Sequence, residues 1–253
     1  MTEHIALFSG GNDSLVSTHY CMTEEETDKV LYIDTGTGLK ENEDFIRKVC
    51  DEYDWDLMVK GSSTSLKEFA LKYGFPGPAA HSWVYRYLKE RVLQQIATNA
   101  EKKPHFYGGV RRAESERRMR TVGEEEVEEG GGGRWWWHSP IMDWSDSDVE
   151  KYRDEHDLPT NSVTEKIHRS GDCFCGAFAT RDEELVELQA HYPEHYEWLM
   201  SVEEEVQEEL GDEEDKCYWG HGGSSDTEMT YLRKGEEKLC SSCQNNIQNS
   251  ADW

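Results

Sequence analysis

The sequence predicts an α/β protein in which a mostly parallel β-sheet carries helices on both faces, followed by an acidic helical and cysteine-bearing C-terminal segment. Short apolar runs alternate with helix-compatible stretches through the first half of the 253 residues, and strands that alternate with helices build parallel sheets. A glycine pair follows the first apolar run, where such sheets turn tightly into a helix. A chain of this length can bury a sizeable core.

The expected elements follow from their apolar spacing, in order along the chain. The first run ends in Gly-Gly and leads into a helix-compatible stretch, and the same signal returns after it. Two more apolar runs come after a long helical stretch, and Ser145 is a good N-cap for a later helix. The expected strands are residues 4–9, 30–34, 56–59, 105–108 and 134–138, and the expected helices are residues 13–22, 42–53 and 81–99.

Charged and glycine-rich stretches complete the chain. Residues 124–133 are acidic and then glycine-only, which predicts a mobile loop. Residues 181–215 hold 15 acids and one base, with apolar positions at helical spacing, which indicates amphipathic helices with a solvated acidic face. From residue 217 onward the chain is too poor in apolar residues to form its own core. It needs another means of attachment, which its cysteines could provide. We therefore expect an α/β domain at 1–178 with the segment 179–253 packed on it.

The net charge restricts the function. Acidic residues number 53 against 27 Lys and Arg, which gives a formal charge of -26. This is the opposite of a nucleic-acid footprint and excludes a generic electrostatic DNA or RNA binder at ordinary salt. The 9 Trp, 12 Tyr and 7 Phe argue against disorder. An over-acidic folded surface indicates a halophilic protein, because high salt screens its self-repulsion.

The apolar pattern also bears on location. No stretch approaches the roughly 20 apolar residues that cross a bilayer, and the start of the chain lacks a basic region followed by an apolar run. We expect a cytoplasmic protein with no membrane partner. In a reducing compartment, the seven cysteines indicate ligands, catalytic thiols or buried apolar residues before disulfides.

A hexapeptide at the end of the first expected strand carries the sharpest chemical signal. Ser9-Gly10-Gly11-Asn12-Asp13-Ser14 opens the first helix. Backbone N–H groups, closely approaching glycines and hydroxyls at a helix N-terminus form a phosphate cradle. The spacing is not that of the Walker loop, and a Gly-Gly turn capped by Asp13 is the structural alternative.

This hexapeptide resembles the PP-loop of the adenine-nucleotide alpha-hydrolase superfamily, and later motifs make the chain similar to the phosphoadenosine phosphosulfate (PAPS) reductase family. The resemblance covers roughly residues 4–178 and rests on the order and spacing of the motifs. They are Ile33-Asp34-Thr35-Gly36, Gly109-Val110-Arg111-Arg112-Ala113-Glu114-Ser115 with Arg117, Ser139-Pro140-Ile141 with Trp144, Asp148 and Val149, Leu158-Pro159-Thr160-Asn161, and the pair Cys173 and Cys175.

The resemblance implies a Rossmann-like fold and a bound adenine nucleotide, either ATP, adenosine phosphosulfate or PAPS. It places the phosphate or phosphosulfate on the PP-loop, with Asp13 as an expected catalytic residue. Asn12 stands where some members carry Lys, so part of the positive charge must come from elsewhere. The expected phosphate-binding residues are Ser9, Gly10, Gly11, Asn12, Asp13 and Ser14.

An arginine cluster can supply that charge. Guanidinium groups bind phosphate and sulfate bidentately, whereas ion pairs with neighbouring glutamates are the structural alternative. By the resemblance, Arg111 and Arg112 contact the ligand, Glu114 orients them, and Arg111 is a catalytic candidate. Five of the 13 arginines belong to the cluster: Arg111, Arg112, Arg117, Arg118 and Arg120.

A second ligand-binding position is expected after the second strand. Asp34 ends that strand at the carboxyl edge of the sheet, where open α/β sheets bind ligands. It would hold the ribose, an adenine edge or a Mg²⁺ ion, or it merely ends the strand and caps a turn. Thr35 and Gly36 would pack against the nucleobase.

Two cysteine pairs predict a metal centre. Cys173 and Cys175 together with Cys240 and Cys243 fit a [4Fe–4S] cluster or a tetrahedral Zn²⁺ ion, with unligated thiols as the alternative. Cluster-bearing members of the family have adjacent cysteines where this chain has one residue between them. The site would staple the C-terminal segment onto the sheet domain.

The reaction implied by the resemblance is reduction of a sulfonucleotide, with a thiol donor protein as partner. The reductases attack with a cysteine in a short C-terminal motif, and residues 244–253 contain none. Cys217 is the nearest substitute, because His221 would lower its pKa.

Other functions stay open. One is ATP-dependent adenylation, as in the ATP sulfurylase small subunit. Another is sulfur transfer of the DNA-phosphorothioation type, the one case with a nucleic-acid partner. The last is a non-catalytic nucleotide-binding module.

The acidic composition generates a first prediction. Raising KCl from 0.1 M to 3 M should raise the melting temperature, because the Debye length falls from about 10 Å to a few ångströms and the self-repulsion is screened. Circular dichroism in a KCl series measures it. A melting temperature that does not rise with KCl contradicts the halophilic interpretation.

Overall fold

The computed structural model describes residues 2–25, 27–114, 126–211 and 214–222. Their sheet is six-stranded, in the order β3-β2-β1-β4-β6-β5. Every neighbouring pair is parallel except β5 with β6, which is antiparallel. The mostly parallel α/β fold is therefore confirmed. The strands are β1 (His4–Leu7), β2 (Lys29–Asp34), β3 (Leu57–Gly61), β4 (His105–Tyr107), β5 (Val127–Gly130) and β6 (Trp135–His138).

One expected loop is a strand. Residues 124–133 were expected to form a mobile loop, but within them β5 pairs with β6 as a hairpin. Its glycine turn, Gly131 to Gly133, has positive φ angles at all three residues, which glycine adopts without strain. The charges of β5 suit an edge strand, because they discourage pairing with another chain. The prediction was wrong because it treated composition as decisive.

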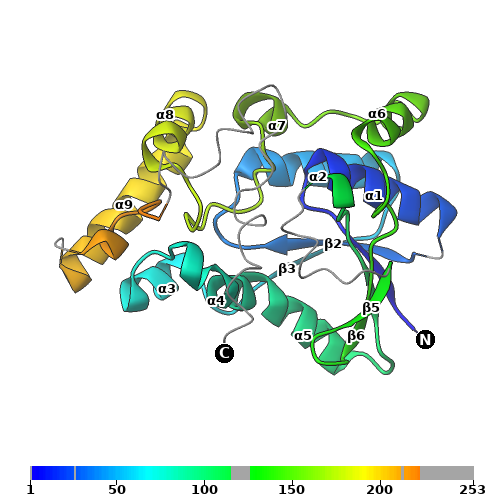
Figure 1. Cartoon of the computed structure of the whole chain (residues 1–253), viewed down its shortest axis with the longest axis horizontal. Helices are drawn as coiled ribbons and strands as arrows, with labels where there is room; N and C mark the ends of the chain where they lie inside the picture. The colour runs from blue at the N-terminus through cyan, green and yellow to red at the C-terminus, as the bar shows by residue number, and fades with distance from the viewer. Residues whose placement is uncertain (1, 26, 115–125, 212–213, 223–253) are drawn as a thin grey trace.

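Helices cover both faces of the sheet, as expected (Figure 1). Residues of α1, α2 and α6 build one core cluster with β2 and with Phe8, which follows β1. Leu93 of α5 packs on the other face with Ile5, Leu31 and Phe106. The helices are α1 (Asn12–Glu24), α2 (Lys40–Glu52), α3 (Leu66–Tyr73), α4 (His81–Tyr85), α5 (Arg91–Asn99), α6 (Asp146–Glu155), α7 (Ser162–Ile167), α8 (Arg181–His191) and α9 (Pro193–Leu210).

A local sequence signal explains the start of α6. Ser145 caps α6 in a capping box with Asp148, as its sequence predicted.

The expected helix 81–99 is present, but a π-helical turn at Arg86–Glu90 separates α4 from α5. Such turns are rare and often occur at functional sites. This one carries Lys89, which forms an ion pair with Asp172.

The acidic segment forms α8 and α9, as expected. Trp219 anchors the described residues that follow α9 to the core. Trp219 is completely buried, and its indole nitrogen donates to the Phe174 carbonyl at 2.9 Å. Its backbone nitrogen donates to Glu203, which also forms an ion pair with Arg181. Residues on both sides of position 178 share one core cluster, and the boundary itself stays a prediction. In the described part of the chain, no helix is long and apolar enough to cross a membrane.

Buried histidines generate a pH prediction. Burial, together with the smaller effects of the neighbouring His105 and His4, lowers the pKa of His138 to about 4. The unfolded chain takes up this proton near pH 6.5, so His138 makes stability fall as the pH drops from 6.5 towards 4. In His138→Gln the melting temperature should fall less over this range than in wild type. Equal losses in both proteins would contradict the assignment.

Candidate functional site

The PP-loop residues lie at the switch point of the sheet. The strand order places β1 between β2 and β4, so the connections leaving β1 and β4 turn to opposite sides and leave a crevice at the carboxyl edge. Ligands of open α/β sheets bind in such a crevice. Residues 8–11 leave β1 there and lead directly into α1. The expected phosphate loop therefore stands where the topology places a ligand.

The loop conformation depends on glycine. Gly10 has a φ of +85°, and Gly11 is the N-cap of α1. The Ser14 hydroxyl donates to the Gly11 carbonyl at 2.9 Å and accepts from the Ser9 hydroxyl at 3.0 Å. The two hydroxyls and the start of the helix thus form one hydrogen-bonded turn, and its role as a phosphate cradle stays a prediction.

The loop after β4 packs on this turn. A Cβ atom at Gly109 would lie 2.8 Å from the Asp13 carbonyl oxygen, so only glycine fits. Two residues later, Arg111 Nε lies 3.0 Å from Asp13 Oδ2, and its Nη1 lies 2.9 Å from Asp146 Oδ1. The Arg111 side chain is only 7% exposed. Its charge is shared between two carboxylates, so within the described residues Arg111 joins the loop after β4 to α1 and α6.

Arg112 is the more accessible of the two arginines. Its side chain is 38% exposed and pairs with Asp143, which is 81% exposed. A pair this open to water holds the guanidinium weakly. Glu114 ends the short turn Arg112–Glu114. The remaining arginines of the cluster, Arg117, Arg118 and Arg120, lie outside the described residues.

Asp34 and its neighbours form a turn at the end of β2. The Gly36 amide donates to Asp34 Oδ1 at 2.7 Å, so Asp34 caps the turn. Gly36 has space around it, whereas Thr35 is buried and bonds Thr37 and the Asp172 carbonyl. The roles of these residues toward a ribose, a base or Mg²⁺ stay predictions.

Cys173 and Cys175 lie close together in the interior. Both are buried, and the Thr37 hydroxyl donates to the Cys173 sulfur at 3.8 Å. A hydrogen bond from Cys175 lowers the pKa of Cys173 to about 7, burial opposes this, and the Lys89 ammonium assists it. A pocket beside the thiols has a volume of about 10 Å³ and is lined by His81, Val84, Tyr85, Leu88, Lys89, Cys173 and Cys175.

The other two residues of the expected metal centre are not among those that the structure describes. Cys240 and Cys243 fall outside the described residues. Within the residues described, no group of three or more His, Cys, Asp or Glu side chains is arranged to hold a metal ion. The close thiols of Cys173 and Cys175 fit one half of a four-thiolate set, and the metal stays a prediction.

Cys217 is completely buried in the core cluster. The His221 ring lies 3.1 Å from the Phe75 carbonyl oxygen. The catalytic role of Cys217 stays a prediction, and an approaching nucleotide would need a path through packed apolar side chains.

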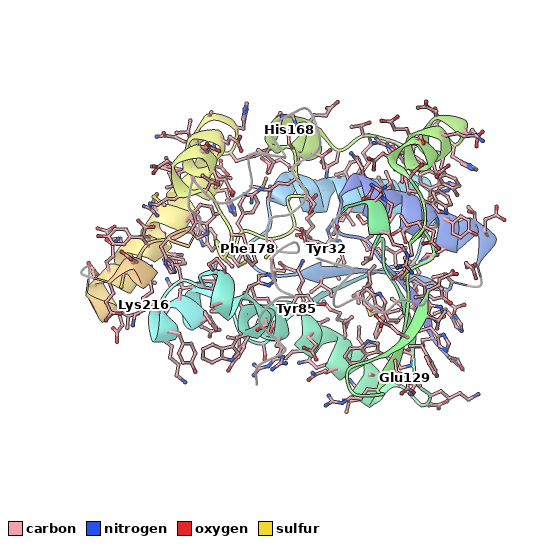
Figure 2. All side chains as sticks on the ribbon, in the orientation of Figure 1. Tyr32, Tyr85, Glu129, His168, Phe178 and Lys216 are labelled. Atoms are coloured by element: carbon pink, nitrogen blue, oxygen red, sulfur yellow. The ribbon has the colours of Figure 1, made fainter. Side chains whose placement is uncertain are left out.

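Sequence reasoning missed Asn42 and Lys89, and it named Asn161 only as the last residue of the motif Leu158–Asn161, without a role. Both asparagines contact the phosphate loop, and Lys89 stands at the thiol pocket. Asn161 carries a local signal, because it caps α7 through the Val163 amide. Figure 2 shows the two sides of the site: His168, which ends α7, lies across the sheet from Tyr85, which lines the pocket.

Residues 3–177 match the family of the phosphoadenosine phosphosulfate reductase domain. The chain belongs to this PAPS reductase family. The match spans the PP-loop, the arginine loop and the Cys173–Cys175 pair, in the order that the motifs predicted, so the recognition is confirmed.

The chain is similar to three other proteins at modest identity. An uncharacterized protein of Methanocaldococcus jannaschii is 29% identical over 216 residues, covering 84% of this chain and 49% of the relative. A phosphoadenosine 5'-phosphosulfate reductase of Alkalilimnicola ehrlichii is 26% identical over 159 residues, covering 60% of each protein. The chain thus spans only about half to three fifths of these relatives. The PAPS reductase of Candida auris, solved with phosphate, is 19% identical with a TM-score of 0.48, covering 65% of this chain and 78% of that one.

The Arg111 ion pairs generate a prediction about stability. Arg111→Ala should destabilise the fold by about 3 kcal/mol, because it leaves Asp13 buried without its counter-charge. Asp146→Ala is the matched control and should cost under about 0.5 kcal/mol, because Asp146 is 75% exposed. Urea unfolding measures both, and Asp13→Asn added to Arg111→Ala should recover part of the loss. Equal costs for the two single variants would contradict the assignment.

Proposed function

We propose that the chain is an enzyme that binds an adenine nucleotide through its phosphate or phosphosulfate at residues 9–14 and acts on sulfur, by reducing a sulfonucleotide. The observation that carries the proposal is the position of the loop. In a chain of the PAPS reductase family, the Ser9, Gly10, Gly11 and Ser14 turn stands at the switch point between β1 and β4.

The chain's own groups divide the binding task. The backbone amides and the Ser9 and Ser14 hydroxyls receive the phosphate oxygens. Arg112 adds a guanidinium group that exchanges the exposed Asp143 for the ligand. Arg111 acts by holding Asp13 and the loop in place. Asp34 accepts hydrogen bonds from the ribose hydroxyl groups, or it binds Mg²⁺ together with the phosphates.

The sulfur chemistry is assigned to the cysteine segment. Ser170 approaches Gly11, and Cys173 contacts Thr37 after β2, so residues 170–175 run from the phosphate loop to the thiol pair. Reduction of a sulfonucleotide to sulfite takes two electrons, which a thiol donor protein would deliver. If Cys173, Cys175, Cys240 and Cys243 hold a [4Fe–4S] cluster or Zn²⁺, the group supplies charge beside the nucleotide and fixes the segment. We place this enzyme in the cytoplasm, where reducing conditions keep cysteines such as Cys173 and Cys175 in the thiol form.

ATP-dependent chemistry is the second candidate, and the burial of Cys217 favours it. The thiol expected to attack has no exposed surface, and residues 244–253 contain no cysteine. Cleavage of ATP to activate an acceptor needs no attacking thiol. An acceptor in DNA would have to meet local arginines, because the net charge of -26 repels it.

Ligand-dependent stabilisation distinguishes these functions. With anaerobically prepared protein in high salt, PAPS or adenosine phosphosulfate at about 100 times its Kd should add roughly 2.7 kcal/mol to the folded state and raise the melting temperature. Differential scanning fluorimetry measures the shift, with adenosine as the control.

Each outcome points one way. Stabilisation by a sulfonucleotide alone supports the reductase. Stabilisation by ATP alone replaces it with adenylation or sulfur transfer. Binding without turnover of any of the three nucleotides indicates a non-catalytic module, and no shift with any of them refutes nucleotide binding.

A further inference from the structure

Two buried asparagines hold the backbone of the phosphate loop from behind. Asn42 Nδ2 donates to the Ser9 carbonyl at 3.0 Å, and Asn161 Nδ2 donates to the Gly10 carbonyl at 2.8 Å. Asn161 Nδ2 also donates to Asn42 Oδ1 at 2.8 Å. The exposed fractions are 0% for Asn42 and 1% for Asn161, so neither side chain is available to touch a ligand.

The peptide geometry converts these bonds into an orientation. In a planar trans peptide, the carbonyl and the following N–H point in opposite directions, and the described residues contain no cis peptide. Because the Ser9 and Gly10 carbonyls point at the asparagines, the amides of Gly10 and Gly11 point the other way. Successive amides turned to one side form an anion-binding concavity.

The fit around the asparagines is tight. A Cβ atom at Gly10 would lie 2.2 Å from Asn42 Oδ1. Gly171 packs on the other side, where a Cβ atom would lie 3.1 Å from Asn42 Cβ. Asn161 Oδ1 accepts from the Val163 amide at 3.0 Å. The side chain of each asparagine is therefore held in one position, and its hydrogen bond fixes the orientation of the loop carbonyl that it contacts.

We propose that Asn42 and Asn161 are positioning residues for phosphate binding: they turn the Gly10 and Gly11 amides toward the phosphate or phosphosulfate group. We call the two side chains the asparagine latch. The inference rests on the proposed function for the identity of the ligand, and it adds residues from α2 and from the start of α7 to the binding machinery. The latch acts on the phosphate end of a nucleotide and leaves the adenosine end unaffected.

The test uses the full chain and two probes that carry phosphate, ATP and inorganic pyrophosphate, with adenosine as the probe that carries none. Asn161→Ser is the main variant, because Ser still caps a helix but cannot reach the Gly10 carbonyl. Asn42→Ala removes the bond to Ser9. Thr164→Ala is the matched control: the buried Thr164 side chain lies in α7, and its hydroxyl donates to the Asn161 backbone carbonyl, not to the phosphate loop. Isothermal titration calorimetry gives affinities, and circular dichroism gives the melting temperature without ligand.

In Asn161→Ser and Asn42→Ala, ATP and pyrophosphate should bind about tenfold more weakly, the effect of losing one net hydrogen bond of roughly 1.4 kcal/mol. Adenosine should bind within twofold of wild type. Thr164→Ala should lower the melting temperature and leave all three affinities unchanged. Loss of stability alone would not move the ratio of ATP to adenosine affinity, so this ratio separates positioning from packing.

Three results overturn the inference. They are unchanged ATP and pyrophosphate affinity in both latch variants, an equal loss for adenosine, and the same affinity loss in Thr164→Ala. The proposed function fails separately: wild-type protein that binds pyrophosphate but no adenine nucleotide refutes it, while the latch is still tested by pyrophosphate. Wild-type protein that binds none of pyrophosphate, ATP, adenosine phosphosulfate and PAPS refutes both.

Discussion

The buried ion pair between Arg111 and Asp13 joins the two loops on which the site depends. Strands β1 and β4 are neighbours in the sheet although about a hundred residues separate them in the chain, and at their carboxyl ends only loops can fill the crevice. The pair bridges these loops at 3.0 Å, and Gly109 lets the backbones approach. A low local dielectric strengthens such a pair and makes an unpaired partner costly, so the loop geometry is fixed together with the sheet.

The surplus of acid explains how arginines are used in the interior. Arg169 pairs with Glu184, with both side chains under 9% exposed, and Arg181 pairs with Glu203, which is 8% exposed. A buried guanidinium group needs a carboxylate partner. Arg111 follows the same rule, because its guanidinium group pairs with Asp13. In an acidic sequence, an arginine can therefore indicate either a buried carboxylate partner or an anionic ligand. The exposure of its side chain distinguishes these two roles.

The sheet, its helices and the phosphate loop could be predicted from sequence because their signals are local. Apolar periodicity located β1, β2, α1 and α2, and Gly-Gly before a helix located the loop. The strand β5 could not be predicted, because an edge strand of glutamate and glycine depends on pairing with β6. Asn42 was missed, and Asn161 was named in a motif but given no role, for a similar reason: their partners are carbonyls 33 and 151 residues away. The burial of Cys217 depends on the packing of α3, α8 and α9, which no local pattern encodes.

The phosphate loop and the thiol segment behave as one packed unit. Ser170 lies against Gly11, Gly171 lies against Asn42, and the Asp172 carbonyl accepts from Thr35. Interiors this closely packed transmit small displacements, because no free volume absorbs them. A phosphate that draws in the Gly10 and Gly11 amides would therefore move residues 170–172, and with them Cys173. From these contacts we expect nucleotide binding to be coupled to the state of the thiol pair.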